Sequence, residues 1–336
     1  MHQRGSREAV ERRDHDPASF AGQGVREAVA GVNGEIASAL RGRTWERLDD
    51  IDGALIALDG TDNKSRLGAN AVVGVSMAAA WAFAARRGAP LWRSFVGLLG
   101  EPRMPVPHFN VLNGGVHARN ALDFQEFMIA PLGVPTEADA VRAGAEIYAT
   151  LRHLLAARGL SVGLGDEGGF APELTSPEEV LGLLVEAIEA AGYVAGRDGV
   201  ALAMDPASSE FYRDGAYHVA GQSLSSGEMV ERYAAMVERY PIWLLEDGLA
   251  ESDWDGWVRL TDRLGHRIEL VGDDIFCTNP TIAEAISRGV ANASLIKVNP
   301  IGTVTETLEA MRVCQRAGYK QFVSHRSGGD RRCVHR

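Results

Sequence analysis

One stretch, residues 269–299, constrains the fold of this chain more than any other. It contains a short apolar run that ends at Asp273, a helical segment over residues 280–289, and a second apolar run that carries Lys297. Short apolar runs without polar alternation are typical of parallel strands that are buried on both faces. A helical crossover makes such strands parallel neighbours and brings their carboxyl ends to one edge of the sheet. We therefore expect a carboxylate beside an amine at that edge, as in a metal ligand beside a base.

The same pattern of strand, polar strand end and helix recurs through the second part of the chain. We expect strands that end, in order, at Asp205, Glu246, Asp273, Lys297 and His325. Repeated units of this kind predict an α/β fold with a TIM-type β/α barrel, whose site lies at the carboxyl ends of the strands. A doubly wound open sheet is the alternative, but it would gather ligands at one switch point and not from five successive strands.

A change of pattern near residue 104 predicts two domains. Residues 1–100 contain predicted helices and no strong strand, and two prolines interrupt the chain between residues 101 and 105. We expect a mostly helical domain over residues 1–100 and an incomplete barrel over residues 104–336.

The net charge and the cysteine content narrow the possible partners and the location. The formal net charge of −11 argues against nucleic acid or an anionic membrane as the main partner, because both require a basic face. The three cysteines are scattered and odd in number, which indicates a reducing cytoplasm and no disulfide framework.

Residues 68–85 carry no charge and reach the length of a membrane span. They are mainly Ala, Gly and Val, so we expect a tightly packed buried helix there and no membrane span.

Three carboxylates at one barrel mouth require protons or a cation. At ~4 Å and an effective dielectric constant near 20, each like-charged pair repels by about 4 kcal/mol. Asp205, Glu246 and Asp273 offer only oxygen ligands, which favours Mg²⁺ or Mn²⁺ over zinc. For any one of these acids, a solvated strand end or a helix cap is the alternative interpretation.

Three further residues could supply acid–base and anion-binding groups. Lys297 lies within an apolar run, and burial near a metal would lower its pKa, as a general base requires. Glu167 lies in a glycine-rich loop and is a candidate acid, and Arg326 after a strand suits a phosphate or carboxylate. The alternatives are a stabilising ion pair for the lysine, a solvated turn for the glutamate and a surface position for the arginine. Together these groups fit proton abstraction beside a metal-bound carboxylate, with a second acid that helps a leaving group depart.

The glycine-rich loop also matches the pattern G-x-G-x-x-G over residues 163–168. This pattern marks a dinucleotide site only when a helix follows the loop directly. Here Gly-Phe-Ala-Pro follows and cannot open such a helix, so we reject a dinucleotide site.

These residues lie in motifs through which the chain resembles the enolase family. The motifs include Asn113-Gly-Gly-Val-His117, Gly165-Asp-Glu-Gly-Gly-Phe-Ala-Pro172 and Ser324-His-Arg-Ser-Gly328, and others lie at residues 59–70, 125–129, 205–210, 246–251, 272–274 and 297–299. The resemblance extends from about residue 5 to residue 328. It implies an incomplete enolase-like barrel, preceded by the remnant of an α+β N-terminal domain.

The resemblance also implies a reaction, namely the reversible Mg²⁺-dependent dehydration of 2-phosphoglycerate to phosphoenolpyruvate in glycolysis and gluconeogenesis. Enzymes of this superfamily combine a Lys or His base with one or two Mg²⁺ ions. By this resemblance Lys297 is the base, Glu167 with the support of Glu126 is the acid, and the metal ligands are Asp205, Glu246 and Asp273. The implied substrate-binding residues are His117, Gln125, Glu126, His325, Arg326 and Ser327. Family members are homodimers or larger, so a homo-oligomer is expected.

Both ends of the chain depart from the family pattern. Enolases begin with three strands and a mobile loop whose serine helps bind a second metal, whereas this chain has Arg4-Gly5 where Thr-Gly is expected. After Gly328 the resemblance stops, so we expect the last barrel strand, with its substrate-binding lysine, and the closing helices to be missing. We interpret the Arg-rich tail as the product of a reading frame that shifts near residue 328.

Two other functions are compatible with this sequence. The first is a non-catalytic protein derived from enolase that binds Mg²⁺ or assembles with an intact enolase. The second is another member of the superfamily that acts on a different carboxylate. Such members usually carry Lys-x-Lys on an early barrel strand, where this chain has Gly165-Asp-Glu-Gly-Gly169, which favours a true enolase.

Overall fold

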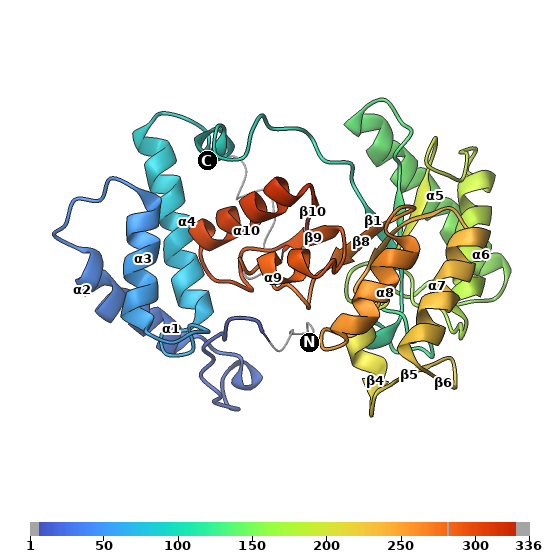
Figure 1. Ribbon diagram of the computed structural model, residues 1–336, viewed down its shortest axis with the longest axis horizontal. Helices are drawn as coiled ribbons and strands as arrows, with labels where there is room; N and C mark the ends of the chain where they lie inside the picture. Colours follow the sequence, from blue (N-terminus) through green and yellow to red (C-terminus); the bar gives the residue numbers. More distant parts are fainter. Residues whose placement is uncertain (1–6, 281, 327–336) are drawn as a thin grey trace. The chain divides into compact units, whose positions relative to one another are not determined.

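The computed structural model describes residues 7–280 and 282–326, which form two compact units (Figure 1). The first unit contains residues 103–275 and 285–293. The second unit contains residues 7–102 and 294–326, together with the described part of residues 276–284. The predicted domains, 1–100 and 104–336, stay a prediction. Arg4-Gly5, Ser327 and the tail after Gly328 lie outside the described residues.

The first unit is built on five strands that are covered by helices. In sheet order these strands are β1 (Phe109–Asn113), β2 (Glu126–Ala130), β3 (Ala201–Asp205), β7 (Ile242–Glu246) and β8 (Glu269–Gly272). The helices that flank them are α5 (Glu137–Ala157), α6 (Pro177–Ala190), α7 (Ser226–Arg239) and α8 (Trp254–Leu264) (Figure 1). All five residues of β3 are buried. The apolar strands therefore form the core between helices, as their sequence pattern predicts.

The second strand runs against both of its neighbours, whereas β3, β7 and β8 are parallel. The connection between β1 and β2 holds a single 3-10 turn, η4 (Gly115–His117), among the described elements, and is too short for a helical crossover. Two helices, α5 and α6, separate β2 from β3. Because each successive element reverses the direction of the chain, two helices leave the flanking strands antiparallel. This reversal was not anticipated from the sequence.

A small antiparallel sheet between β3 and α7 was also missed. It consists of β4 (Tyr212–Arg213), β5 (Ala216–Val219) and β6 (Gln222–Leu224), and the 3-10 turn η5 (Ser208–Phe211) precedes it. Asp214-Gly215 forms its first turn with positive φ at both residues, a typical hairpin signal that was available in the sequence. The buried Tyr217 donates its hydroxyl hydrogen to Asp253 at the start of α8, so this sheet packs onto the barrel helices.

The second unit contains the N-terminal helices and the last described strands. Its helical segments are α1 (Arg26–Gly31), the π-helix η2 (Val32–Ile36), α2 (Ala37–Leu40), α3 (Leu48–Asp59), α4 (Ala69–Arg86) and α10 (Val304–Ala317), with 3-10 turns η1 (Phe20–Gly22) and η3 (Leu91–Phe95). Its strands are β9 (Ala293–Ile296), which lies almost entirely in this unit, and β10 (Lys320–Val323), and these two are neighbours. The short helix α9 (Ile282–Ser287) spans the division between the units. Since β8 and β9 belong to different units, their predicted pairing stays a prediction.

Helix α4 covers most of the uncharged run, where we expected a tightly packed buried helix, and it is buried on one face. Its buried residues follow the helical repeat and include Val72, Ser76, Ala80 and Ala84. Met77 and Trp81 on another face are 44% and 41% exposed. Among the described residues, α4 is the one helix long and apolar enough to cross a membrane, a test that core helices of soluble proteins also pass.

The buried face of α4 helps to hold the start of α10. The backbone N–H of Val304 donates to Ser76 Oγ at 2.9 Å, and the N–H of Thr305 donates to Asp52 Oδ2 of α3 at 2.9 Å. The first N–H groups of a helix have no partner within the helix, and they carry partial positive charge that favours a carboxylate. Side chains of the N-terminal helices therefore fix where α10 begins.

Candidate active site

The glycine-rich loop that carries Glu167 is fastened to the end of β1. The Phe170 N–H donates to the Val111 carbonyl at 2.9 Å, and the Asn113 N–H donates to the Phe170 carbonyl at 2.8 Å. The Gly169 N–H donates to Asn113 Oδ1 at 3.0 Å. The backbone of the loop is thus hydrogen-bonded to the backbone of β1 and to the side chain of Asn113.

Two glycines of this loop, Gly165 and Gly169, are explained by the closeness of Asn113. A Cβ atom at Gly165 would lie 2.7 Å from the His117 carbonyl oxygen and 2.8 Å from Asn113 Cβ. A Cβ atom at Gly169 would lie 2.5 Å from Asn113 Oδ1 and 2.9 Å from the backbone nitrogen of Leu112. The G-x-G-x-x-G pattern therefore belongs to a packed loop that is not followed directly by a helix.

We expect Gly169→Ala to lower the free energy of unfolding by roughly 1–3 kcal/mol, because the methyl group must displace the backbone or Asn113. Denaturant unfolding of both proteins measures this change. Gly227→Ala in α7 is the matched control, because a Cβ atom there meets no other atom within 4 Å. Equal stabilities of the Gly169→Ala and wild-type proteins would contradict the packing argument.

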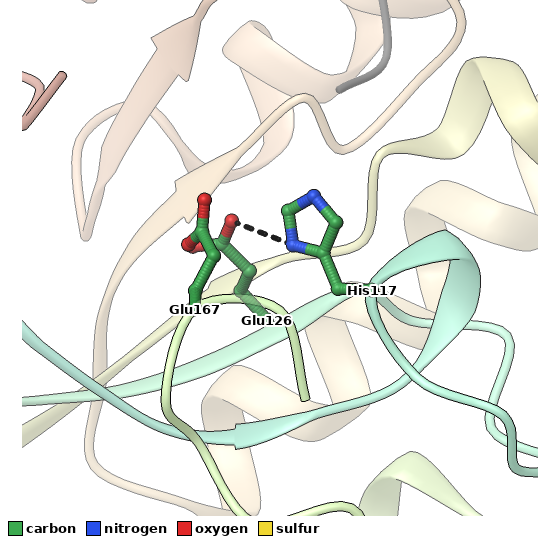
Figure 2. Close-up of side chains that lie close together, drawn as sticks. All are labelled: His117, Glu126 and Glu167. Carbon is green, nitrogen blue, oxygen red and sulfur yellow. Dashed lines mark ion pairs between the residues drawn. The ribbon is translucent and has the colours of Figure 1, made fainter. Parts of the chain in front are cut away.

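Three predicted site residues from three segments of the chain, one of them Glu167, come together (Figure 2). Ligand atoms of His117, Glu126 and Glu167 all lie within 4.8 Å of one another. His117 Nδ1 is 3.5 Å from Glu126 Oε1, and Asn110 Nδ2 donates to Glu167 Oε2 at 3.1 Å. His117 is buried at the end of η4, and Glu126 begins β2. We call these three residues the His–Glu cluster.

A second group of acids lies at the ends of the three adjacent parallel strands. Asp205 ends β3, Glu246 ends β7, and Asp273 follows the last residue of β8. Asp205 and Glu246 are only 6% and 9% exposed. Asp and Glu side chains are rarely buried to this extent. Together with Asp273 they gather carboxylates at one end of the sheet, which makes the strand-end acids a candidate cation site in the first unit.

Strand pairing brings the two groups next to each other. Glu126 and Asp205 are direct partners across the antiparallel pair β2 and β3. Gln125, also predicted as a site residue, is buried with Nε2 at 3.5 Å from Asp205 Oδ2. Its Oε1 atom is buried and has no hydrogen-bond partner within the described part of the chain. A bound ligand could supply that partner.

The electrostatics of the strand ends also fit a bound cation. Asp247 follows Glu246 and is buried; burial raises its pKa, and the nearby carboxylates of Asp274, Asp273 and Asp205 raise it further. Carboxylates this close repel one another unless a proton or a cation compensates them. The strand-end acids offer only oxygen atoms, the donor type that Mg²⁺ prefers.

The remaining predicted site residues belong to the second unit. Lys297 directly follows β9, and its backbone N–H donates to Thr278 Oγ1 at 2.9 Å. His325 and Arg326 follow β10 and are exposed. Ser327 lies outside the described residues. The approach of these side chains to the acids of the first unit stays a prediction.

Sequence reasoning missed the residues that hold the predicted ones in place. Asn110 contacts Glu167, Asn113 holds the glycine-rich loop, and the Tyr148 hydroxyl donates to the Gly168 carbonyl at 2.7 Å. Asn113 lies within a motif that was already noted, which was an available signal. The neighbours of Asn110 and Tyr148 become visible only in the folded chain.

Comparisons with known proteins bear on the family and the fold of the chain. Residues 101–333 match the family model described as "Enolase, C-terminal TIM barrel domain", and residues 2–95 match "Enolase, N-terminal domain". An enolase of Rubrobacter xylanophilus is 53% identical over 327 residues, which cover 96% of this chain and 76% of the relative. The barrel domain of the matching family confirms the predicted fold class of an incomplete TIM-type α/β barrel.

Proposed function

The chain belongs to the enolase family, and on this premise we propose that it is a Mg²⁺-dependent lyase that interconverts 2-phosphoglycerate and phosphoenolpyruvate. The observation that carries the proposal is the junction of two groups at one end of the sheet. The His–Glu cluster could handle protons, and the strand-end acids could hold a cation, with Glu126 opposite Asp205 between them. This junction supports a reaction that needs acid–base groups beside a metal, as dehydration of a phosphorylated hydroxy acid does.

Asp205, Glu246 and Asp273 would hold the Mg²⁺ ion. When bound, the ion supplies charge stabilisation for the substrate carboxylate, on the order of several kcal/mol. The burial of Asp205 and Glu246 near Asp273 supports this assignment, because buried carboxylates at one end of the sheet repel one another unless a cation or a proton compensates them.

Lys297 and Glu167 are assigned the two proton transfers. The Lys297 amine takes the proton from C2, and the electron pair of that C–H bond forms the C2–C3 double bond. The C3–O bond breaks, and Glu167 gives its proton to the departing hydroxyl group, which leaves as water. Glu167 suits this role because Asn110 and the rest of the His–Glu cluster orient its carboxyl group.

The other site residues are assigned to substrate binding. By the family resemblance Arg326 and Ser327 are assigned to the phosphate, and His325 lies beside them in the sequence. A guanidinium group binds phosphate oxygens through paired hydrogen bonds. In the first unit, His117 and Gln125 line the substrate pocket.

The proposed reaction also suggests a pathway, a cellular location and partners for the protein. We assign the protein to glycolysis and gluconeogenesis in the cytoplasm, with small-molecule substrates as its partners and not nucleic acid. A homo-oligomer is also part of the proposal, and the mass of the purified protein by light scattering tests it.

The function is tested by incubating the purified chain with 2-phosphoglycerate and Mg²⁺ and measuring phosphoenolpyruvate. We expect product to form, to stop when EDTA removes the metal, and to resume when Mg²⁺ is restored in excess. A folded protein that binds Mg²⁺ without turnover would contradict the proposal. That result would favour the alternative, a non-catalytic Mg²⁺-binding or assembly protein.

A further inference from the structure

Asp247, which follows the last residue of β7, joins the segments that carry the proposed metal ligands. It is 5% exposed. Its Oδ1 atom accepts the N–H of Asp273 at 2.9 Å, and its Oδ2 atom accepts the N–H of Asp274 at 3.0 Å. Each carboxylate oxygen therefore accepts one of two consecutive N–H groups in the turn that follows β8.

The backbone of Asp247 extends these contacts to both neighbouring strands. Its N–H donates to the Val271 carbonyl of β8 at 3.0 Å, and its carbonyl accepts the N–H of Ser208 at 3.1 Å. The segment of Ser208 also holds Asp205, whose Oδ1 atom accepts the N–H of Ala207 at 2.8 Å. Asp247 thus connects the ends of β3, β7 and β8.

The identity of the side chain follows from these contacts. Asp247 has a φ of 37°, in a region that Asp tolerates better than most residues. Two backbone donors converge on it, so both side-chain atoms must be acceptors, and only a carboxylate provides two. Burial of a carboxylate near other acids is costly, and the two N–H donors compensate it in part.

We propose that Asp247 is a positioning residue that holds the Asp273-Asp274 turn in the geometry that binds Mg²⁺. This inference rests on the metal ligands assigned under the proposed function. Residues that orient metal ligands typically change metal affinity 10–100-fold when they are replaced.

The test is Asp247→Asn, with Mg²⁺ affinity measured by calorimetry in the absence of substrate. An Asn side chain turns an NH₂ group toward one of the two backbone donors, so one hydrogen bond is lost in either orientation. We expect Mg²⁺ to bind roughly 10–100-fold more weakly. Wild-type affinity in a folded Asp247→Asn protein would overturn the inference and leave the proposed function standing.

The matched control is Asp59→Asn in the second unit. Asp59 is also buried, and its carboxylate also accepts two backbone N–H groups, from Thr61 at 3.1 Å and from Leu67 at 2.7 Å. We expect Asp59→Asn to lose stability and to keep wild-type Mg²⁺ affinity. A similar loss of affinity in both variants would assign the effect to general destabilisation and overturn the inference.

Amide hydrogen exchange of the wild-type protein keeps the inference testable if Asp247→Asn does not fold. We expect the Asp273 and Asp274 amides to be protected before Mg²⁺ is added. Exchange of both amides at unprotected rates would overturn the positioning role. Wild-type protein that does not bind Mg²⁺ at all would instead contradict the proposed function, so the two failures can be told apart.

Discussion

Lys297→Ala should abolish measurable conversion of 2-phosphoglycerate to phosphoenolpyruvate, with a fall in kcat of roughly 10²–10⁴-fold or more. The proton at C2 is weakly acidic, and without the amine no positioned base removes it. The Lys297 contact with Thr278 Oγ1 is made by the backbone N–H, so the alanine variant keeps it. Steady-state turnover at saturating substrate and Mg²⁺ measures the effect.

Lys320→Ala is the matched control for the loss of a lysine. Lys320 begins β10, is exposed, and has no assigned role in the reaction. We expect its turnover to match that of the wild type. Retained turnover in Lys297→Ala, or an equal loss in both variants, would remove Lys297 from the role of base.

Glu167→Gln should lower turnover by a similar factor, roughly 10²–10⁴-fold, for a different reason. Glutamine has the same shape and can still accept the hydrogen bond from Asn110, but it has no proton to give to the leaving hydroxyl group. The substrate should therefore bind and lose its C2 proton, while breakage of the C3–O bond becomes slow. Parallel measurements of kcat and KM should show a loss in kcat with little change in KM.

Glu173→Gln controls for the loss of a negative charge close to the glycine-rich loop. Glu173 is exposed and follows the loop by a few residues. Its turnover should equal that of the wild type. If Glu167→Gln were as active as this control, the acid would have to be another residue.

Much of the fold could be predicted from the sequence because its pattern is local. The starts of α5, α6, α7 and α8 are marked in the sequence by capping residues, and Ser225 and Glu228 form a capping box at the start of α7. The direction of β2 was missed, because it depends on how many elements connect the strands. The π-helix η2 lies inside a region that reads as one continuous helix, since a wider turn leaves no distinct mark on the apolar repeat.

Some of the candidate site residues could likewise be found from the sequence, and others could not. The strand-end positions of Asp205, Glu246 and Asp273 could be predicted, because a polar residue at the end of an apolar run is visible in the sequence. Asn110 and Asp247 could not, because their role lies in hydrogen bonds to segments distant in sequence. Asp247 also follows the predicted ligand Glu246 directly, so the sequence does not distinguish a positioning role for Asp247 from the role of its neighbour.

The most direct test of the account follows 2-phosphoglycerate by NMR in D₂O with the purified chain and Mg²⁺. It records deuterium incorporation at C2 and phosphoenolpyruvate formation in the same sample. We predict both in the wild type, neither in Lys297→Ala, and exchange without product in Glu167→Gln. Absence of both exchange and product in folded, Mg²⁺-bound wild-type protein would contradict the claim that this chain holds a working base and acid.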